Sequence, residues 1–159
     1  IPFEVIPGVT TASSAAANLG VSLSKRNLSR SISFVTPATS KNTKIDNDWL
    51  NTVLNSDTSI IYMAGKDRKN IAKLLIAKGM DPSCPIAVVE NAGFEHGYKK
   101  IMHLSELAQN EFFELQGPVC LILGKVLLDS YLKGEQDLSQ NNFFYAQKHK
   151  KIEKICYGK

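Results

Sequence analysis

The sequence has neither long apolar runs nor the short motifs that usually mark metal or phosphate sites. None of its apolar runs approaches the ~20 residues that a helix needs to cross a bilayer. It has no Cys-x-x-Cys pair, no histidine at zinc-ligand spacing, no Walker loop and no Gly-x-Gly-x-x-Gly. These absences argue against a membrane protein, a zinc protein, a P-loop nucleotidase and a Gly-rich dinucleotide-binding domain.

Cysteine is scarce, and its three positions, Cys84, Cys120 and Cys156, are far apart in the chain. An odd number of widely spaced cysteines does not predict a disulfide framework. We therefore expect reduced, mostly buried thiols in a cytoplasmic protein.

The chain has no net charge outside its C-terminal end. Residues 146–159 hold five lysines and one glutamate, which account for the whole net charge of +4. The preceding 145 residues are neutral and lack the basic face with interleaved aromatic residues that is typical of nucleic-acid binders. We expect no nucleic-acid partner. We interpret residues 129–159 as an extension, with a solvated or frayed lysine-rich end, of a domain formed by residues 1–128.

What the sequence does contain is an alternation of apolar, strand-like segments with amphipathic, helix-like segments. Such an alternation predicts an α/β fold with a largely parallel sheet flanked by helices. Two adjacent strands expected over residues 85–91 and 97–104 predict that the sheet is mixed. Strands are expected over residues 3–6, 29–36, 58–65, 85–91, 97–104 and 117–124, and helices over residues 10–20, 46–54, 66–79 and 104–110.

The first expected helix follows a short apolar strand and a Pro-Gly turn. Thr10 or Thr11 can cap it by accepting hydrogen bonds from free backbone N–H groups, and Gly20 can close it. The alanines and serines at positions 12–17 leave room beside the helix start. Two interpretations stay open, which are close packing of this helix on the sheet and a seat for a ligand.

Small or turn-forming residues follow four of the expected strands, at positions 7–11, 36–38, 63–65 and 91–93. In open α/β sheets, ligands bind beyond the carboxyl ends of the strands. These four ends offer hydroxyls, backbone groups and a thioether with little charge. They suit a neutral aromatic or adenosyl group better than a phosphate.

Two side chains at these strand ends leave alternatives open. Met63 either fills a gap in the core or lies against a ligand. Glu90 is either a buried acid or a carboxylate that accepts from neighbouring backbone N–H groups. No nucleophile–base pair and no pair of carboxylates has a spacing that predicts catalysis. The residues alone therefore predict a binding surface and no catalytic group.

Four motifs occur in the order and spacing of the tetrapyrrole methylases: IPFEVIPGVTTASSAAANLGVSL, KRNLSRSISFVT, IIYMAG and PIAVVENA. From about Ile1 to Leu127 the sequence resembles this family, and within it the second domain of the uroporphyrinogen-III C-methyltransferase branch, which also forms the methylase half of sirohaem synthase. The resemblance implies S-adenosylmethionine-dependent C-methylation of uroporphyrinogen III to precorrin-2. It also implies that the chain is the C-terminal half of a two-domain enzyme, whose N-terminal domain, with the catalytic acid and base, lies upstream of Ile1.

The resemblance implies a role for four residues. Thr10, Thr11, Met63 and Ala92 would contact S-adenosylmethionine in a cleft between the two domains. It further implies a tetrapyrrole substrate and a homodimer. We expect the isolated chain to be inactive, because half of the cofactor cleft would be missing.

The chain departs from the family pattern at three places. Lys25-Arg26-Asn27 stands where the family has His-Arg-Asp, Thr36-Pro37-Ala38 where it has Thr-Gly-His, and Ala92 where it has glycine. Alanine at position 92 fits if its φ is negative, whereas the other two changes affect tetrapyrrole handling more than cofactor binding. Arg26 is expected to bind substrate carboxylates, and the alternative is a pair with a local acid.

Two other functions stay open. One is a non-catalytic module, a truncated or decayed domain that keeps its fold and serves dimer contacts. The other is a sister methylase that uses the same cofactor and acts on a later corrin intermediate.

Overall fold

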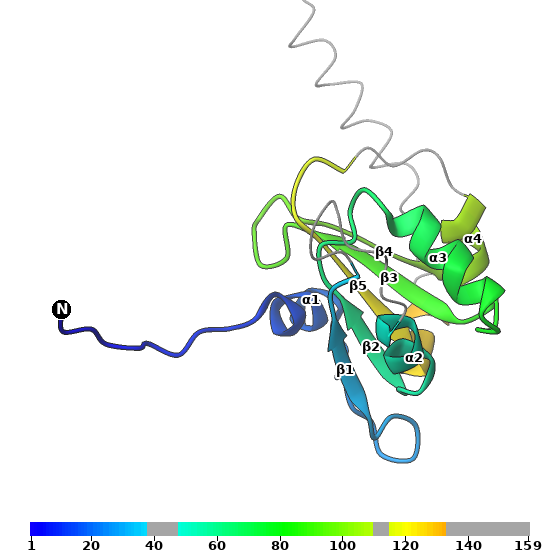
Figure 1. The fold of residues 1–159 in the computed structure, drawn as a ribbon, viewed down its shortest axis with the longest axis horizontal. Helices are drawn as coiled ribbons and strands as arrows, with labels where there is room; N and C mark the ends of the chain where they lie inside the picture. The colour runs from blue at the N-terminus through cyan, green and yellow to red at the C-terminus, as the bar shows by residue number, and fades with distance from the viewer. Residues whose placement is uncertain (38–47, 110–114, 133–159) are drawn as a thin grey trace, which may run out of the picture.

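The computed structural model describes residues 1–37, 48–109 and 115–132. In these residues a five-stranded sheet lies between two layers of helices (Figure 1). The elements in chain order are α1 (Thr11–Leu19), β1 (Ile32–Val35), α2 (Asp48–Leu54), β2 (Thr58–Ile61), α3 (Arg68–Ala77), β3 (Pro85–Glu90), β4 (Tyr98–His103), α4 (Leu104–Gln109), β5 (Val119–Gly124) and the 3-10 turn η1 (Lys125–Leu127).

The sheet has the strand order β1-β2-β5-β3-β4 and is mixed, as the sequence predicts. The expectation that it is largely parallel is wrong, because among the described strands only β1 and β2 pair in parallel, whereas the other three pairs are antiparallel. The last strand, β5, enters between β2 and β3 and pairs with both in antiparallel register. The two adjacent strands expected over residues 85–91 and 97–104 are confirmed, since β4 pairs antiparallel with β3 along its whole length.

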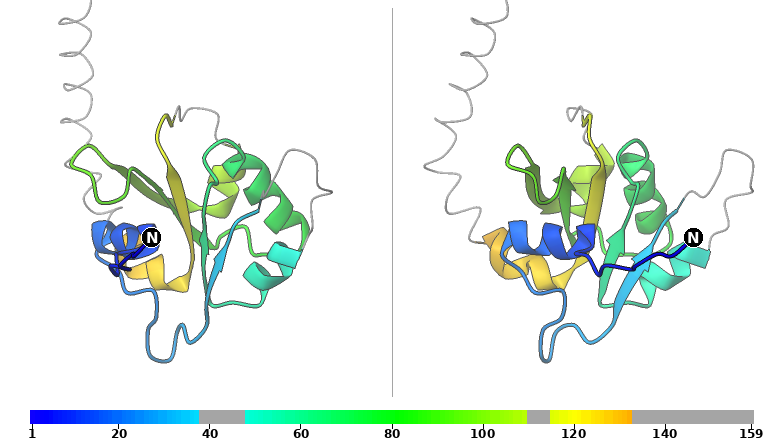
Figure 2. Two further views of the ribbon diagram at one scale, coloured as in Figure 1. Left: turned by 60° about the vertical axis from the view of Figure 1, so that its left-hand side comes forward. Right: turned by 90° about the vertical axis from the view of Figure 1, so that its left-hand side faces the viewer.

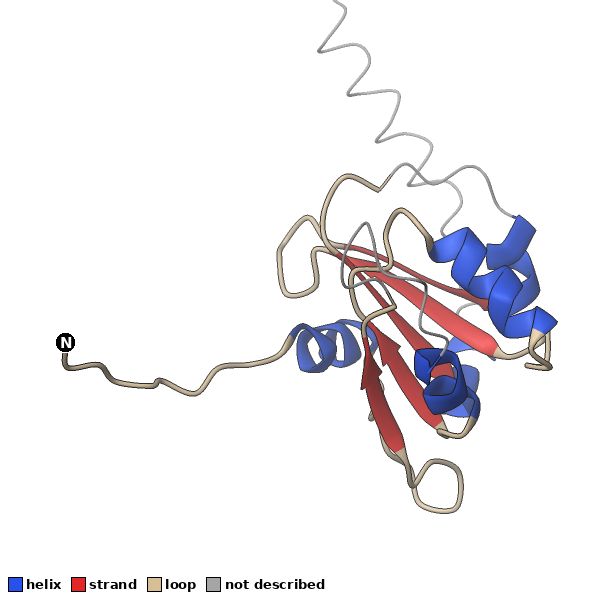
Figure 3. Cartoon of the chain, viewed as in Figure 1, coloured by secondary structure: helices blue, strands red, loops and turns tan. Residues whose placement is uncertain are grey.

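Helices cover both faces of the sheet. Helices α2, α3 and α4 lie on one face, and α1 with η1 lies on the other (Figures 2 and 3). Each side has its own apolar core, and neighbouring residues of one strand serve opposite cores. Ile61 packs on the side of α2 and α3, whereas Ile60 packs on the side of α1. All four residues of β2 and all six of β5 are buried. In β2 these include Thr58 and Ser59, whose hydroxyls are hydrogen-bonded to those of Ser29 and Ser33, whereas β5 is a continuous apolar run.

Helix α1 forms as its sequence predicts. Thr10 is the N-cap, and its hydroxyl accepts from the backbone N–H of Ala12 at 3.0 Å. Gly20 ends the helix in the left-handed conformation with φ 67°, and its N–H bonds to the carbonyls of the last turn. Ala12 and Ala15 are buried in the core beside Ile60. The close-packing interpretation is therefore correct for the buried alanines of this helix.

The strand expected over residues 3–6 does not form. Residues 1–9 run away from the body without a hydrogen-bonded partner (Figure 1). Phe3, Val5 and Ile6 are 86%, 78% and 79% exposed. Apolar alternation gives a segment strand propensity, but a strand also requires a neighbour to bond its backbone. No described segment of this chain supplies that neighbour.

Strand β1 is shorter than expected and turns its apolar side outward. Ile32 and Phe34 share one face, as expected, but both are exposed. The buried positions are Ser33 and Val35. Ser33 is tolerated in the interior because its hydroxyl lies 2.9 Å from that of Ser59 on β2.

Some expectations lie outside the described residues. These are the first two residues of the helix expected over 46–54, Ala38 at the end of the second expected strand, Cys156, and most of the 129–159 extension, of which only residues 129–132 are described. Among the residues that the structure does describe, no helix is both long enough and apolar enough to span a membrane.

Candidate functional site

Three strands bring their carboxyl ends to one edge of the sheet. β3 runs in the same direction as β1 and β2, because β5 pairs antiparallel with both β2 and β3. The segments that follow these strands, residues 36–37, 62–67 and 91–97, therefore lie along one side, which we call the carboxyl edge. Sheet edges of this kind are where α/β proteins bind ligands.

Helix α1 is attached to the carboxyl edge near both of its ends. At its start, the Thr10 hydroxyl oxygen lies 2.8 Å from the Tyr62 hydroxyl oxygen, just after β2. Near its end, the Asn18 side-chain oxygen accepts from the backbone N–H of Gly93 at 2.9 Å, in the loop after β3. Lys99 also donates to the Asn18 carbonyl. The start of α1 is thus held beside the end of β2.

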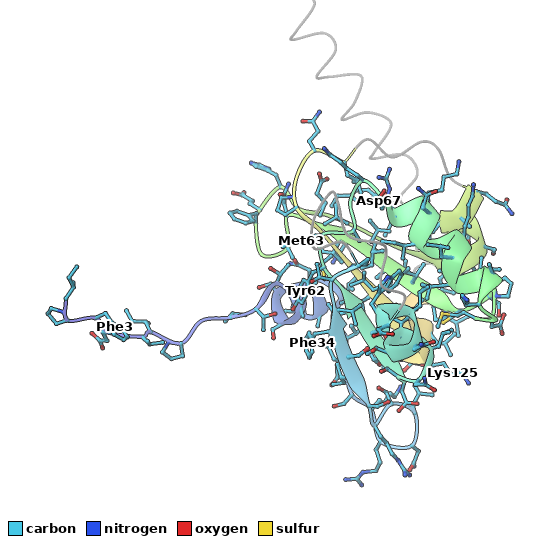
Figure 4. All side chains as sticks on the ribbon, in the orientation of Figure 1. Phe3, Phe34, Tyr62, Met63, Asp67 and Lys125 are labelled. Carbon is cyan, nitrogen blue, oxygen red and sulfur yellow. The ribbon has the colours of Figure 1, made fainter. Side chains whose placement is uncertain are left out.

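Met63 stands at the end of β2 in an unusual conformation. Its φ is 55°, in the left-handed region, which costs a non-glycine residue about 1–2 kcal/mol. Its side chain is 80% exposed and belongs to neither core. This placement excludes the gap-filling alternative. Figure 4 shows Met63 with Phe34 and Tyr62 near the start of α1.

The ring of Tyr62 is fixed from a second direction. It stacks on Phe34 with 6.3 Å between ring centroids and 16° between ring planes. Its backbone N–H donates to the Val35 carbonyl at 2.9 Å. Tyr62 therefore joins β1 to α1, since its backbone and its ring both contact β1 and its hydroxyl reaches the start of α1.

The end of β3 is held by a carboxylate. Glu90 accepts from the backbone N–H groups of Gln116 and Gly117, at 2.6 and 2.5 Å. The second of the two readings of Glu90 is therefore correct. Asn91 has φ 51° and packs so closely on Gly117 that a Cβ there would overlap the Asn91 side chain. These contacts set the path of the chain into Ala92.

Ala92 is half-buried and packs against the core on the α1 side. It is not among the described non-glycine residues with positive φ. The condition under which alanine can replace the family's glycine at this position is therefore met. Thr10, Thr11 and Met63 are exposed, so the carboxyl edge presents hydroxyl groups, a thioether and a small apolar side chain.

The described residues offer little for nucleophilic or metal chemistry. Burial raises the pKa of the Cys84 thiol to about 11 and that of the Cys120 thiol to about 12. Both thiols are free and protonated at neutral pH, as the sequence predicts for reduced, buried cysteines. No group of three His, Cys, Asp or Glu residues within the described ranges could hold a metal ion.

Arg26 does not lie with the other four predicted residues. It belongs to a tight turn in which Lys25 and Ser29 pair, directly before β1. Lys25 bonds to Asp129 at 2.5 Å, and Asp129 follows the carboxyl end of β5, which lies beside the start of β2. Arg26 is thus at the opposite end of the strands from Met63. Its substrate role stays a prediction, and it gains no support from proximity to the carboxyl edge.

Two residues at or next to the carboxyl edge do not stand out in the sequence. Tyr62, at the edge, and Phe34, within β1, fit the pattern of apolar strands and carry no further signal of a site. The signal for Tyr62 was its place directly before Met63 in the motif IIYMAG. Its hydroxyl contact crosses 52 positions of the chain, a separation that no local pattern encodes.

The chain matches the family described as Tetrapyrrole (Corrin/Porphyrin) Methylases over residues 1–108. The chain belongs to this family.

The chain is similar to sirohaem synthases and to uroporphyrin-III C-methyltransferases. The siroheme synthase of Hahella chejuensis is 35% identical over 128 residues, which is 80% of this chain and 27% of the relative. That of Salmonella typhi is 33% identical over 132 residues, again 80% of this chain and 27% of the relative. The chain therefore spans about a quarter of the length of these curated relatives.

Two solved structures from Thermus thermophilus extend this likeness to three dimensions. The native uroporphyrin III C-methyl transferase has a TM-score of 0.66 and 31% identity, over 80% of this chain and 52% of that one. The same enzyme complexed with S-adenyl homocysteine has a TM-score of 0.66 and 30% identity, over 81% and 55%. The chain thus covers about half of each solved enzyme.

Proposed function

We propose that this chain is the second half of an S-adenosylmethionine-dependent C-methyltransferase that converts uroporphyrinogen III to precorrin-2. One observation supports assigning cofactor binding to particular residues. Met63 is held in a strained backbone conformation with an exposed side chain, at the strand end beside the start of α1. Strained, exposed residues of this kind cluster at functional sites. The names of the relatives reported above support the proposed reaction and substrate class.

The residues present fit a cofactor with a polar tail and an adenosyl group. Thr10 and Thr11 offer hydroxyls at the start of a helix whose N–H dipoles point outward. Met63 offers a polarizable thioether suited to lie against an aromatic face, and the chain beside Ala92 offers backbone groups. The cofactor supplies an electrophilic methyl group on sulfur. This chain's residues bind and orient it, and the catalytic acid and base come from the upstream half.

The same proposal includes the partners and the compartment. The upstream domain closes the cofactor cleft, two copies form a homodimer, and a tetrapyrrole is the substrate. Free thiols at Cys84 and Cys120 are compatible with a reducing cytoplasm. A few cationic side chains would bind the carboxylates of the substrate, and Arg26 is our candidate for one of them.

The test compares the protein encoded by the complete reading frame with the isolated chain. The complete protein, given S-adenosylmethionine and uroporphyrinogen III, should yield methylated product that mass spectrometry detects. The isolated chain should yield none, because it lacks half of the cleft. Methyl transfer by the isolated chain would contradict the two-domain proposal. A complete protein that neither transfers methyl groups nor binds S-adenosylhomocysteine supports the non-catalytic module instead.

A sister methylase acting on a later corrin intermediate shares the cofactor and differs in substrate. The solved cobalt precorrin-4 methyltransferase is 19% identical to this chain with a TM-score of 0.67, which is a likeness of fold alone. The Thermus enzyme, at 31% identity, favours uroporphyrinogen III. Offering both substrates to the complete protein and comparing kcat/KM separates the two functions.

A further inference from the structure

We propose that Tyr62 is a positioning residue, whose hydroxyl holds Thr10 so that the two together present one hydroxyl proton to the cofactor. This inference rests on the proposed function. It starts from a contact between the start of α1 and the end of β2, in which the two hydroxyl oxygens are 2.8 Å apart. That distance is typical of an O–H···O hydrogen bond.

The hydrogen bonds of these two hydroxyls can be counted. Each has one proton and two acceptor positions. One acceptor position of Thr10 is used by the backbone N–H of Ala12 at 3.0 Å. The bond between Thr10 and Tyr62 uses one proton, whichever oxygen donates it. One hydroxyl proton is therefore left to donate, and the described contacts of this chain give it no acceptor.

The ring of Tyr62 makes this arrangement rigid. Phe34 stacks on one side at a centroid distance of 6.3 Å, and the backbone of Tyr62 is bonded to Val35. The hydroxyl is thus fixed relative to the sheet, and through it the Thr10 side chain is fixed in one rotamer. An isolated N-cap threonine would have only the Ala12 bond to orient it. The remaining proton is on one of these two exposed hydroxyls, beside the carboxyl edge, and in this proposal an acceptor oxygen or nitrogen of the cofactor receives it.

The stack on Tyr62 gives Phe34, an exposed aromatic residue of β1, a structural role. Phe34 is 54% exposed and lies on the α1 side of the sheet, in register with Ile60. Its described aromatic partner is Tyr62. The two rings and the two hydroxyls form one connected unit that extends from β1 to α1.

The experiment uses the complete protein and titrates S-adenosylhomocysteine calorimetrically. Tyr62→Phe keeps the ring and its stack on Phe34 but removes the hydroxyl. We expect the Kd to rise about three- to tenfold, the scale of one lost hydrogen bond. The melting temperature should change little, because this contact is exposed. Tyr131→Phe, a matched hydroxyl deletion beside His103 at the other end of the sheet, should leave the Kd unchanged.

A double-mutant cycle separates positioning from mere proximity. In a Thr10→Val background, Tyr62→Phe should cause no further loss of affinity, whereas in a Thr10→Ser background its effect should persist. An unchanged Kd in Tyr62→Phe, or a lower melting temperature with an unchanged Kd, would overturn the proposal while the proposed function stands. If the unmodified complete protein fails to bind S-adenosylhomocysteine, the proposed function and this inference fall together.

Discussion

Met63 offers a perturbation in which stability and affinity should change in opposite directions. Its φ of 55° strains any residue with a Cβ, and its side chain is 80% exposed. Replacing it by glycine removes the strain and the side chain together. Replacing it by alanine removes the side chain and keeps the strain. The two variants therefore separate the backbone's contribution from the thioether's.

The expected magnitudes follow from these two facts. Glycine avoids the strain of a Cβ in the left-handed conformation, which raises the free energy of unfolding by about 1–2 kcal/mol. The greater conformational freedom of glycine in the unfolded chain lowers it by about 0.4–1 kcal/mol. Met63→Gly should therefore stabilise the fold by about 0.5–1 kcal/mol, whereas Met63→Ala should be nearly neutral. Both should lose about 1–2 kcal/mol of S-adenosylhomocysteine affinity, because both lack the thioether and its apolar area.

The assay is thermal unfolding of the complete protein together with calorimetric titration. The glycine variant should melt about 1–4 °C above the alanine variant, and both should bind S-adenosylhomocysteine about five- to thirtyfold more weakly than the parent. Two results would refute the reasoning. Unchanged affinity in both variants removes Met63 from the cofactor site. A glycine variant less stable than the alanine variant shows that the backbone at this position is not strained.

Three further predictions concern the scaffold and the substrate. Gly124→Ala should destabilise the fold by about 1–3 kcal/mol in chemical denaturation, because the φ of Gly124 is 142° and a Cβ there would overlap the Asp57 carbonyl. The control Gly8→Ala should leave the stability unchanged, because no atom lies near the added Cβ. Hydrogen bonds, chiefly from the backbone of Ser31, hold the pKa of Asp57 below its usual range. Its stabilising effect is therefore present above about pH 4 and lost as the pH falls through the folded-state pKa, so Asp57→Asn should show a shallower acid loss of melting temperature. Arg26→Ala in the complete protein should raise KM for uroporphyrinogen III, most at low salt, with an unchanged melting temperature, and a lower melting temperature with unchanged KM would instead assign Arg26 to its turn.

The elements of the fold could be predicted from the sequence where burial alone decides them. β3 and β5 are buried and almost wholly apolar, and α3 shows a periodic apolar face with Ile71 and Leu75 in the core. The place of β5 in the sheet could not be predicted in this way. A central strand is buried on both faces whether its neighbours run parallel or antiparallel to it. The apolar sequence of β5 therefore does not distinguish the two directions.

The segment 3–6 failed as a predicted strand for a related reason. Its alternation reports propensity, whereas strand formation depends on a partner that local sequence does not contain. At Phe34 the local pattern was predicted correctly, but the burial of the side chain was not. Its place on one face of β1 follows from the period of two, but whether that face is covered depends on elements far away in the chain. At the site, Thr10 and Met63 were predictable from turn chemistry and family motifs, while the Tyr62 contact depended on tertiary structure.

Three described non-glycine residues have positive φ. They differ in whether their side chain and their hydrogen bonds offset the strain of this conformation. Asn27 sits in a tight turn closed by hydrogen bonds to Lys25, and asparagine tolerates this conformation. Asn91 is again asparagine, and its backbone N–H is bonded to the Pro118 carbonyl. Met63 has neither the suitable side chain nor a described hydrogen bond or core contact that would offset its strain. Backbone strain of this kind, without an offsetting contact among the described residues, is the observation that led us to propose Met63 as a cofactor-binding residue.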